Sequence, residues 1–343
     1  MSKTLRICHL SEGIAGHNGQ VLGIIKTLKD AGFKVSTQEV KVTWSIKPIR
    51  SILRLVARKI SRFPNTFSIG CILACYKTDQ VEDFDIVISS GSNLAPINLA
   101  LAKKHNAKNI HMSSIRDWRV EDFTAYITTT QISILPNNLR PEIVPNQFDP
   151  LSCKEEGEKF IEQNNLAEEK FSLLVLGGDG IGYTYTAQEW NMMIKQFIYF
   201  CRKAHTKPLF ITSRRTPKDI ELQLIAEHDS PYSVFFHAEQ RRGVFRHLFY
   251  VAKHIFVTED SSTMISEAVS SGKSVITAYP QSIKAPKKYT DIIAKYQKLN
   301  FIERKSLKTL QSTDFVIDRD ISDKVAEMLK KFQEQLLNRL QLD

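Results

Sequence analysis

The chain has 343 residues, 42% of them hydrophobic and 24% charged, and its formal net charge is +10. This length exceeds that of a usual single domain, so we expect two domains with separate cores. No stretch approaches the roughly 20 apolar residues of a membrane-spanning helix, and no signal-peptide pattern is present. The five cysteines are scattered. Their spacing excludes a zinc site and a disulfide framework and predicts a reducing, cytoplasmic compartment.

The first residues alternate between a strand, a turn and a helix. Residues 5–10 form an apolar strand, a glycine-rich turn covers residues 11–20, and residues 21–31 have apolar side chains at helical spacing. The glycines do not follow the Gly-x-Gly-x-x-Gly pattern of dinucleotide-binding turns, so we exclude NAD and FAD. His17 in this turn is a candidate acid/base group, and a histidine that only bonds the backbone is the alternative. Glycines bring the backbone close to a ligand, here at Gly13, Gly16 and Gly19.

A basic segment follows the second predicted strand. Residues 41–78 contain eight Lys or Arg and no acidic residue. Read as a helix, residues 47–60 place apolar side chains on one side and Arg50, Arg54 and Arg58 on another. This pattern suits the surface of an anionic membrane. A helix packed on its own domain with a solvated basic face is an equal alternative. Interleaved aromatic residues are few, so we expect no nucleic-acid partner.

The remainder of the first half repeats the succession of strand, turn and helix. A polar loop at residues 113–119 follows one strand, and open α/β sheets collect site residues at such strand ends. Asp117 in this loop is a candidate site residue, with a plain surface ion pair as the alternative. Four prolines and three asparagines mark residues 136–150 as the interdomain linker. The predicted strands are residues 33–40, 84–89, 109–112, 123–129 and 132–135, and a helix is predicted at residues 97–105.

The second half restarts the pattern with a glycine turn at residues 177–182 after an apolar strand. A later strand ends at two consecutive arginines, Arg214 and Arg215, and guanidinium groups hold phosphate oxygens bidentately. The sequence therefore predicts an anionic ligand on this side. The predicted strands are residues 171–176, 207–211, 234–236, 255–257 and 274–277. The predicted helices are residues 154–165, 186–202, 243–251 and 323–342, with a further helix after residue 260.

This further helix lies between the last two predicted strands. Asp260 or Ser261 can cap it and Gly272 can end it. Free amides and hydroxyls at its beginning suit a diphosphate. Glu267, about one turn further on, is placed for ribose hydroxyls. An ordinary capped helix with a surface glutamate is the alternative.

Together these elements predict an α/β protein of two Rossmann-like, doubly wound parallel-sheet domains facing a cleft. We expect an acceptor domain at residues 1–145 and a nucleotide-sugar-binding domain at residues 151–320. A C-terminal helix at residues 321–343 is expected to dock across both.

Five motifs, in this order, resemble the mitochondrial-fission ELM family. They are Gly13-x-x-Gly-His-x-x-Gln20, Gly91-x-x-x-Ala-Pro96, Gly177-Gly-Asp179, Thr212-Ser-Arg-Arg-Thr-Pro217, and Val257-Thr-x-Asp-Ser-x-x-Met-x-Ser-Glu-Ala268 with Gly272-Lys273. The family looks like a glycosyltransferase of the two-Rossmann-domain type. A more distant similarity is to the bacterial transferase that adds N-acetylglucosamine to the lipid-linked peptidoglycan precursor.

The resemblance implies roles for particular residues. His17 would act as the acceptor-side base, with Glu12 and Asp117 as alternatives. Glu267 would bind ribose, and an arginine would counter the charge of the leaving group. The residues expected at the acceptor are Gly13, Gly16, Asn18, Gln20 and Ser92. Those expected at the donor are Gly177, Gly178, Asp179, Ser213, Arg214, Arg215, Asp260, Ser261, Ser262, Thr263 and Glu267.

The function expected from these patterns is sugar transfer from a nucleotide-sugar to a membrane-associated glycan or lipid in cell-envelope polysaccharide or lipopolysaccharide synthesis. No Asp-x-Asp metal motif is evident, so we expect neither a metal nor a cofactor. The expected location is the inner face of the cytoplasmic membrane. A nucleotide-sugar epimerase and a non-catalytic membrane-surface scaffold are the alternatives.

Overall fold

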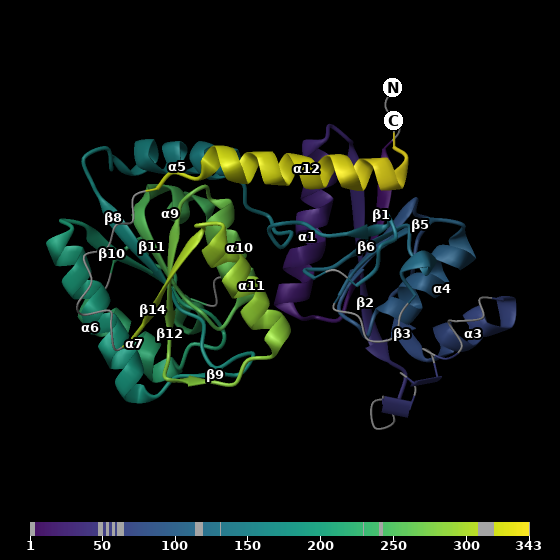
Figure 1. Cartoon of the computed structure of the whole chain (residues 1–343), viewed down its shortest axis with the longest axis horizontal. Helices are drawn as coiled ribbons and strands as arrows, with labels where there is room; N and C mark the ends of the chain where they lie inside the picture. The colour runs from purple at the N-terminus through teal and green to yellow at the C-terminus, as the bar shows by residue number, and fades with distance from the viewer. Residues whose placement is uncertain are drawn as a thin grey trace. The chain divides into compact units, whose positions relative to one another are not determined.

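The chain folds into two compact units. A computed structural model describes residues 4–46, 51–52, 55–56, 59, 65–113, 119–130, 132–228, 230–239, 243–307 and 319–342. The first unit comprises Met1–Gln147 with Met328–Asp343, and the second comprises Phe148–Glu327. The division between the units falls within the last helix, α12 (Ser322–Leu340), rather than before it. Each unit contains its own sheet, mostly parallel in the first unit and wholly parallel in the second (Figure 1).

The first unit is built on a seven-stranded sheet in the order β3-β2-β1-β4-β5-β6-β7. All neighbouring strands are parallel except β3, which pairs antiparallel with β2 at the edge. Every residue of β4 is buried, as expected for a parallel strand covered on both faces. The strands are β1 (Leu5–Ser11), β2 (Val35–Trp44), β3 (Tyr76–Thr78), β4 (Ile86–Ser90), β5 (Lys108–Met112), β6 (Ala125–Ile127) and β7 (Asn138–Leu139).

Helices cover both faces of this sheet. Leu5 and Ile7 of β1 pack in one hydrophobic cluster with residues of α1 (Ala15–Asp30) and the end of α12. Cys8 and Leu10, which point to the opposite face, pack with α3 (Thr66–Ala74) and α4 (Ala95–His105). A short 3₁₀ helix, Val120–Asp122, precedes β6. The sheet is therefore wound on both sides.

The second unit has a five-stranded, wholly parallel sheet in the order β10-β8-β11-β12-β14. A separate two-stranded ladder joins β9 (Tyr183–Thr184) to β13 (Ser282–Ile283). The sheet strands are β8 (Phe171–Val175), β10 (Lys207–Ile211), β11 (Ala252–Thr258), β12 (Val275–Tyr279) and β14 (Ile302–Ser306). The helices are α5 (Pro150–Asn164), α6 (Ala187–Lys203), α7 (Lys218–His228), α8 (Phe236–Glu239), α9 (Arg246–Val251), α10 (Ser262–Ser270) and α11 (Lys287–Lys298). The prediction of two Rossmann-like domains is confirmed.

Helix α1 begins six residues earlier than the sequence predicted. Gly13 has φ +78°, and Ile14 is extended as the N-cap, so the turn is confined to these residues. Glycine inside a helix lowers the stability of the helix by about 1 kcal/mol relative to alanine. For this reason the sequence assigns Gly16 and Gly19 to a turn. His17 consequently lies in the first turn of a helix and not in a loop.

Two predicted strands are wrong. Residues 132–135 form no strand, and Ile134 is 93% exposed, so this apolar run has nothing to pack against. At residues 234–236, Val234 makes a single bridge to Ile211 before α8 begins at Phe236. The amides of His237 and Ala238 each donate to a carboxylate oxygen of Glu221 at 2.7 Å, which stabilises this helix start.

The linker, the start of α9 and the extent of the second sheet also differ from the prediction. The predicted linker, residues 136–150, contains β7 and the side chain of Asp149, which caps α5. Helix α9 begins at Arg246 rather than at residue 243, because Phe245 is its N-cap. β12 does not complete the second sheet, since β14 adds a further strand beside it.

Candidate functional site

Three loops of the second unit meet at the carboxyl ends of adjacent strands. They follow β8, β10 and β11. The Gly177 amide donates to Thr258 Oγ1 at 2.7 Å, and the Gly177 carbonyl accepts from Thr216 Oγ1 at 2.8 Å. Ser213 Oγ donates to the same carbonyl at 3.2 Å. The loops expected to bind the donor therefore form one continuous site, at the edge where parallel sheets place their ligands.

The glycines of the first loop leave no room for a side chain. A Cβ on Gly177 would lie 2.3 Å from both carboxylate oxygens of Asp260. A Cβ on Gly178 would lie 2.1 Å from the carbonyl oxygen of Arg215. Both residues are buried, whereas Asp179 is exposed and accepts from the Tyr185 amide at 3.0 Å. The glycine loop thus lies directly on the other two loops.

An ion pair joins the second and third loops. Arg215 Nη2 lies 2.5 Å from Asp260 Oδ2, with the Asp260 side chain fully buried and that of Arg215 32% exposed. Desolvation raises the pKa of Asp260 to about 6, although Arg215, Thr258 and the Gly178 amide act to lower it. Asp260 holds the guanidinium in place, and the exposed part of Arg215 remains open to an anion. Its neighbour Arg214 is exposed.

The start of α10 has further groups suited to an anion. Ser261 is the N-cap, and its hydroxyl accepts from the Met264 amide at 3.4 Å. Ser262 and Thr263 occupy the first turn and are partly exposed. Amides here have no partner within the helix, and the helix dipole favours negative charge. Glu267 lies further along α10, also partly exposed, and desolvation raises the pKa of its carboxyl to about 7.

A buried carboxylate beside this site, Glu259, was not identified from the sequence. Arg304 donates to both of its oxygens, from Nε at 2.7 Å and from Nη2 at 2.6 Å. The hydroxyls of Tyr183 and Thr277 donate to it at 2.7 and 2.9 Å. The Tyr289 hydroxyl donates to its backbone carbonyl at 2.5 Å. These bonds fix the chain just before Asp260 and the start of α10.

In the first unit, His17 and Glu12 form a hydrogen-bonded pair. His17 Nδ1 lies 2.7 Å from Glu12 Oε1, and Asn93 Nδ2 donates to Glu12 Oε2 at 3.0 Å. Desolvation acts to raise the pKa of Glu12, but the bonds from His17 and Asn93 outweigh it and lower that pKa. A Cβ on Gly91, which has φ +94°, would lie 2.6 Å from Glu12 Oε1 and 2.6 Å from the ring of His17. Asn93 is a further residue that the sequence did not single out.

Other residues expected at the acceptor surround this pair. Ser11 Oγ donates to Asn18 Oδ1 at 2.9 Å, and Ser90 Oγ donates to Gln20 Oε1 at 2.6 Å. Gly16 is partly exposed in α1. Two further predicted residues are exposed, Gly13 and Ser92.

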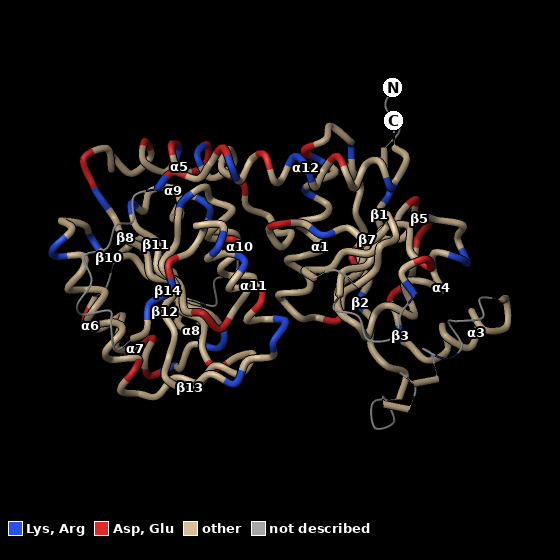
Figure 2. The backbone as a smooth tube through the Cα atoms, in the orientation of Figure 1, with Lys and Arg blue, Asp and Glu red and all other residues tan. Residues whose placement is uncertain are grey.

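Several predicted residues lie outside the described part of the chain, namely Asp117 and the membrane-facing Arg50, Arg54 and Arg58. Among the described residues, no helix is long and apolar enough to cross a bilayer. Within the same residues, no group of three or more His, Cys, Asp or Glu side chains could hold a metal ion. Lys and Arg residues occur beside Asp and Glu residues in both units (Figure 2).

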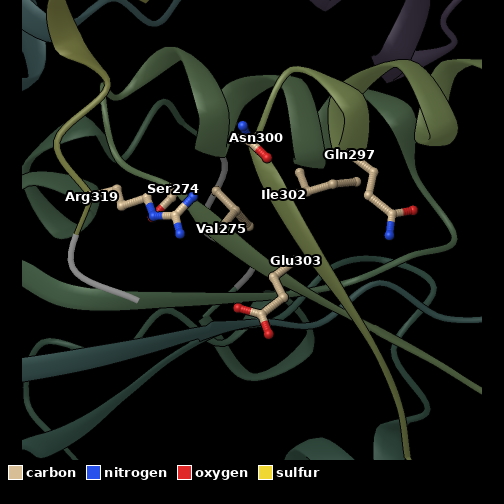
Figure 3. A pocket seen from close by; sticks show the side chains of 7 residues that line it. All are labelled: Ser274, Val275, Gln297, Asn300, Ile302, Glu303 and Arg319. Carbon is tan, nitrogen blue, oxygen red and sulfur yellow. The ribbon is translucent and has the colours of Figure 1, made fainter. Parts of the chain in front are cut away.

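A pocket of about 320 Å³ lies elsewhere in the second unit (Figure 3). Its lining comes from the amino-terminal ends of β12 and β14, the end of α11, Asn300 two residues beyond that helix, and Arg319. The carboxyl-end loops described above are at the other end of these parallel strands. This pocket is therefore not part of the candidate anion site. Its lining residues are Ser274, Val275, Gln297, Asn300, Ile302, Glu303 and Arg319.

Comparison with known proteins identifies one family and a shared fold. The profile of the family described as mitochondrial fission ELM1 matches residues 15–329. No curated protein sequence matches the chain significantly.

Solved structures match over nearly the whole chain. The S. aureus MnaA–UDP co-structure is 8% identical and superposes with a TM-score of 0.50 over 97% of this chain and 90% of that one. UDP-GlcNAc 2-epimerase from Methanocaldococcus jannaschii is 11% identical, with a TM-score of 0.47 over 96% and 100%. The E. coli ADP-heptose lps heptosyltransferase II is 10% identical, with a TM-score of 0.45 over 96% and 99%. At 8% identity, the likeness to the MnaA structure establishes the fold alone.

Proposed function

Because this chain belongs to the mitochondrial fission ELM1 family and combines two Rossmann-like units with an anion site, we propose that it is a nucleotide-sugar-dependent glycosyltransferase. The observation that carries the proposal is the meeting of Gly177, Arg215 and the start of α10 at one sheet edge. A glycine loop, an arginine held by an ion pair and a helix N-terminus are all groups that bind a diphosphate.

The donor would be held along α10. Amides and hydroxyls at Ser262 and Thr263 would bind the diphosphate, and Glu267 would accept hydrogen bonds from the ribose. As the bond between the anomeric carbon and the diphosphate breaks, the leaving oxygen gains negative charge. The helix terminus, Arg215 and Arg214 would stabilise that charge without a metal ion, because their dipoles and charges are already oriented.

The acceptor would be activated in the first unit. Glu12 binds His17 through Nδ1, which leaves Nε2 available to take a proton. The acceptor hydroxyl would lose its proton to Nε2 while its oxygen forms the new bond to the anomeric carbon. Asn93 would keep Glu12 oriented. A histidine whose second nitrogen is held by a carboxylate is an arrangement suited to a general base.

A membrane-associated glycan or lipid of the cell envelope is the proposed acceptor. The support for it is the basic sequence of residues 41–78, with eight Lys or Arg and no acidic residue. Such a segment is attracted to anionic lipid headgroups at about 1 kcal/mol per basic residue near the surface. On this proposal the protein acts at the inner face of the cytoplasmic membrane.

The test is acceptor-dependent turnover. The purified protein is incubated with nucleotide-sugars, with and without an extract of envelope glycans and lipids, and released nucleotide and new glycosides are measured. Release that depends on the extract and is lost in His17→Ala supports the proposal. Isomerisation of the nucleotide-sugar without acceptor would identify an epimerase instead. Vesicle binding with no nucleotide turnover would identify a scaffold.

A further inference from the structure

A two-residue hairpin in the donor loop has an unusual residue at its tip. The Gly180 amide donates to the Tyr183 carbonyl at 3.1 Å, and the Tyr183 amide donates to the Gly180 carbonyl at 2.9 Å. The two residues between them, Ile181 and Gly182, have φ +47° and +89°. Turns of this kind need positive φ at both positions and favour asparagine or glycine. A β-branched residue in the left-handed region is strained.

Ile181 is exceptional among the described residues. Of the six non-glycine residues there with positive φ, it alone is apolar. The other five are Asn106, Asn165, Asn300, His205 and Gln341. Ile181 is 41% exposed, so its side chain is not enclosed by the rest of the protein. Backbone strain of this kind persists where the surrounding structure enforces it, and such residues cluster at ligand contacts.

The surroundings hold this hairpin firmly against the anion site. A Cβ on Gly180 would lie 2.8 Å from Arg215 Nη1 and 3.3 Å from the Asp260 carbonyl oxygen. On the other side, the Lys284 amide donates to the Gly182 carbonyl at 2.6 Å. Gly180 therefore lies beside the arginine that would bind the diphosphate, and the exposed Ile181 is the next residue of the same hairpin.

The position of the hairpin relative to α10 decides which part of a ligand it meets. On the proposed function, Glu267 takes the ribose, one turn beyond the helix start that takes the diphosphate. The group on the other side of the diphosphate then extends away from Glu267 and toward the glycine loop. That group is the sugar to be transferred.

We propose that Ile181 contacts the apolar face of the sugar in the nucleotide-sugar and so contributes to sugar recognition. The inference rests on the proposed function and adds a specificity-determining residue to it. Sugar rings present C–H faces that pack well against an aliphatic side chain. The strained backbone is retained because it presents that side chain to the ligand.

Three variants test this inference. Ile181→Asn removes the apolar contact and suits the left-handed backbone. Ile181→Val keeps both the contact and the strain. Leu222→Gln removes a similar exposed side chain, 65% exposed in α7, as the control. For each, calorimetry gives the Kd of UDP, GDP and TDP and of UDP-N-acetylglucosamine, GDP-mannose and TDP-glucose, and a thermal scan gives Tm.

We expect Ile181→Asn to raise Tm by about 2–4 °C, because strain is relieved. Its Kd for the sugar conjugate that the wild type binds should rise about threefold to tenfold, the loss expected from one or two buried methylene groups. Its Kd for the matching nucleoside diphosphate should change by less than about twofold. Leu222→Gln should bind both as the wild type does. Ile181→Val lacks one carbon atom of isoleucine, so its loss of affinity for the conjugate should be smaller than that of Ile181→Asn.

Three results would overturn the inference. Unchanged affinity of Ile181→Asn for the sugar conjugate would overturn the inference and leave the proposed function standing. Equal losses for the diphosphate and its conjugate would assign Ile181 a structural role and also overturn it. If the wild type binds none of the six compounds, the proposed function fails, and the inference fails with it.

Discussion

Replacing Arg304 with methionine should destabilise the protein strongly, because it leaves the buried Glu259 without its counter-charge. Glu259 is fully buried and accepts four hydrogen bonds, two of them from Arg304. Breaking a buried pair by removing one partner costs about 3–5 kcal/mol. For a unit the size of Phe148–Glu327, this corresponds to a fall in Tm of about 6–20 °C.

The matched control is a surface ion pair of the same unit. Lys207 Nζ lies 2.6 Å from Glu169 Oε1, but the two side chains are 64% and 34% exposed. Lys207→Met should cost no more than about 1 kcal/mol. Thermal and urea unfolding, followed by circular dichroism, measure both. Combining Arg304→Met with Glu259→Gln should recover part of the loss, since the buried charge is then gone. If Arg304→Met costs no more than Lys207→Met, the reasoning from burial is refuted.

Three further predictions concern the two candidate sites. Gly178→Ala should lower both Tm and nucleotide affinity, because its Cβ would meet the Arg215 carbonyl. The control Gly243→Ala should change neither, because a Cβ at Gly243 would have no contact nearer than 3.5 Å. Glu12→Gln should reduce acceptor-dependent turnover at least tenfold and leave the Kd for the nucleotide unchanged; an equal loss of affinity would contradict its role in orienting the base.

The last of these three predictions concerns pH. The pKa of Glu267 is raised to about 7, so its contribution to stability is present below pH 4.5 and is lost as pH rises through 7. The Tm of the wild type should therefore fall relative to Glu267→Gln between pH 5 and pH 8. Affinity for the nucleotide-sugar that the wild type binds, whose diphosphate does not titrate in this range, should rise over the same interval only in the wild type. Parallel pH profiles of the two proteins would exclude this role.

The two-domain fold was predictable because its inner strands are short apolar runs followed by glycine-rich or polar turns. Residues 171–176 and 255–257 read as buried strands for this reason, and both lie at the centre of the second sheet. The loops proposed to bind the donor follow such strands, so their positions could be predicted as well. The contacts among them could not, since Asp260 and Arg215 are 45 residues apart.

No pattern in the sequence indicates the ion pair between Glu259 and Arg304. β14 reads Ile-Glu-Arg-Lys-Ser, which is too polar to indicate a sheet strand, and only its place at the edge allows that composition. Ile181 could not be predicted either, because an isoleucine between two glycines does not indicate a left-handed backbone. The start of α1 was missed for a related reason, since its glycines outweighed the helical pattern locally.

The most direct test of the nucleotide site is calorimetric titration of the wild type and Glu267→Ala with UDP, CMP, GDP and TDP and their common sugar conjugates. One base should bind clearly better than the others. Glu267→Ala should weaken that binding about tenfold or more, since a hydrogen bond to a charged group contributes about 1.5–3 kcal/mol. Absence of binding by every compound, or equal binding by the two proteins, would contradict the assignment of this sheet edge as a donor site.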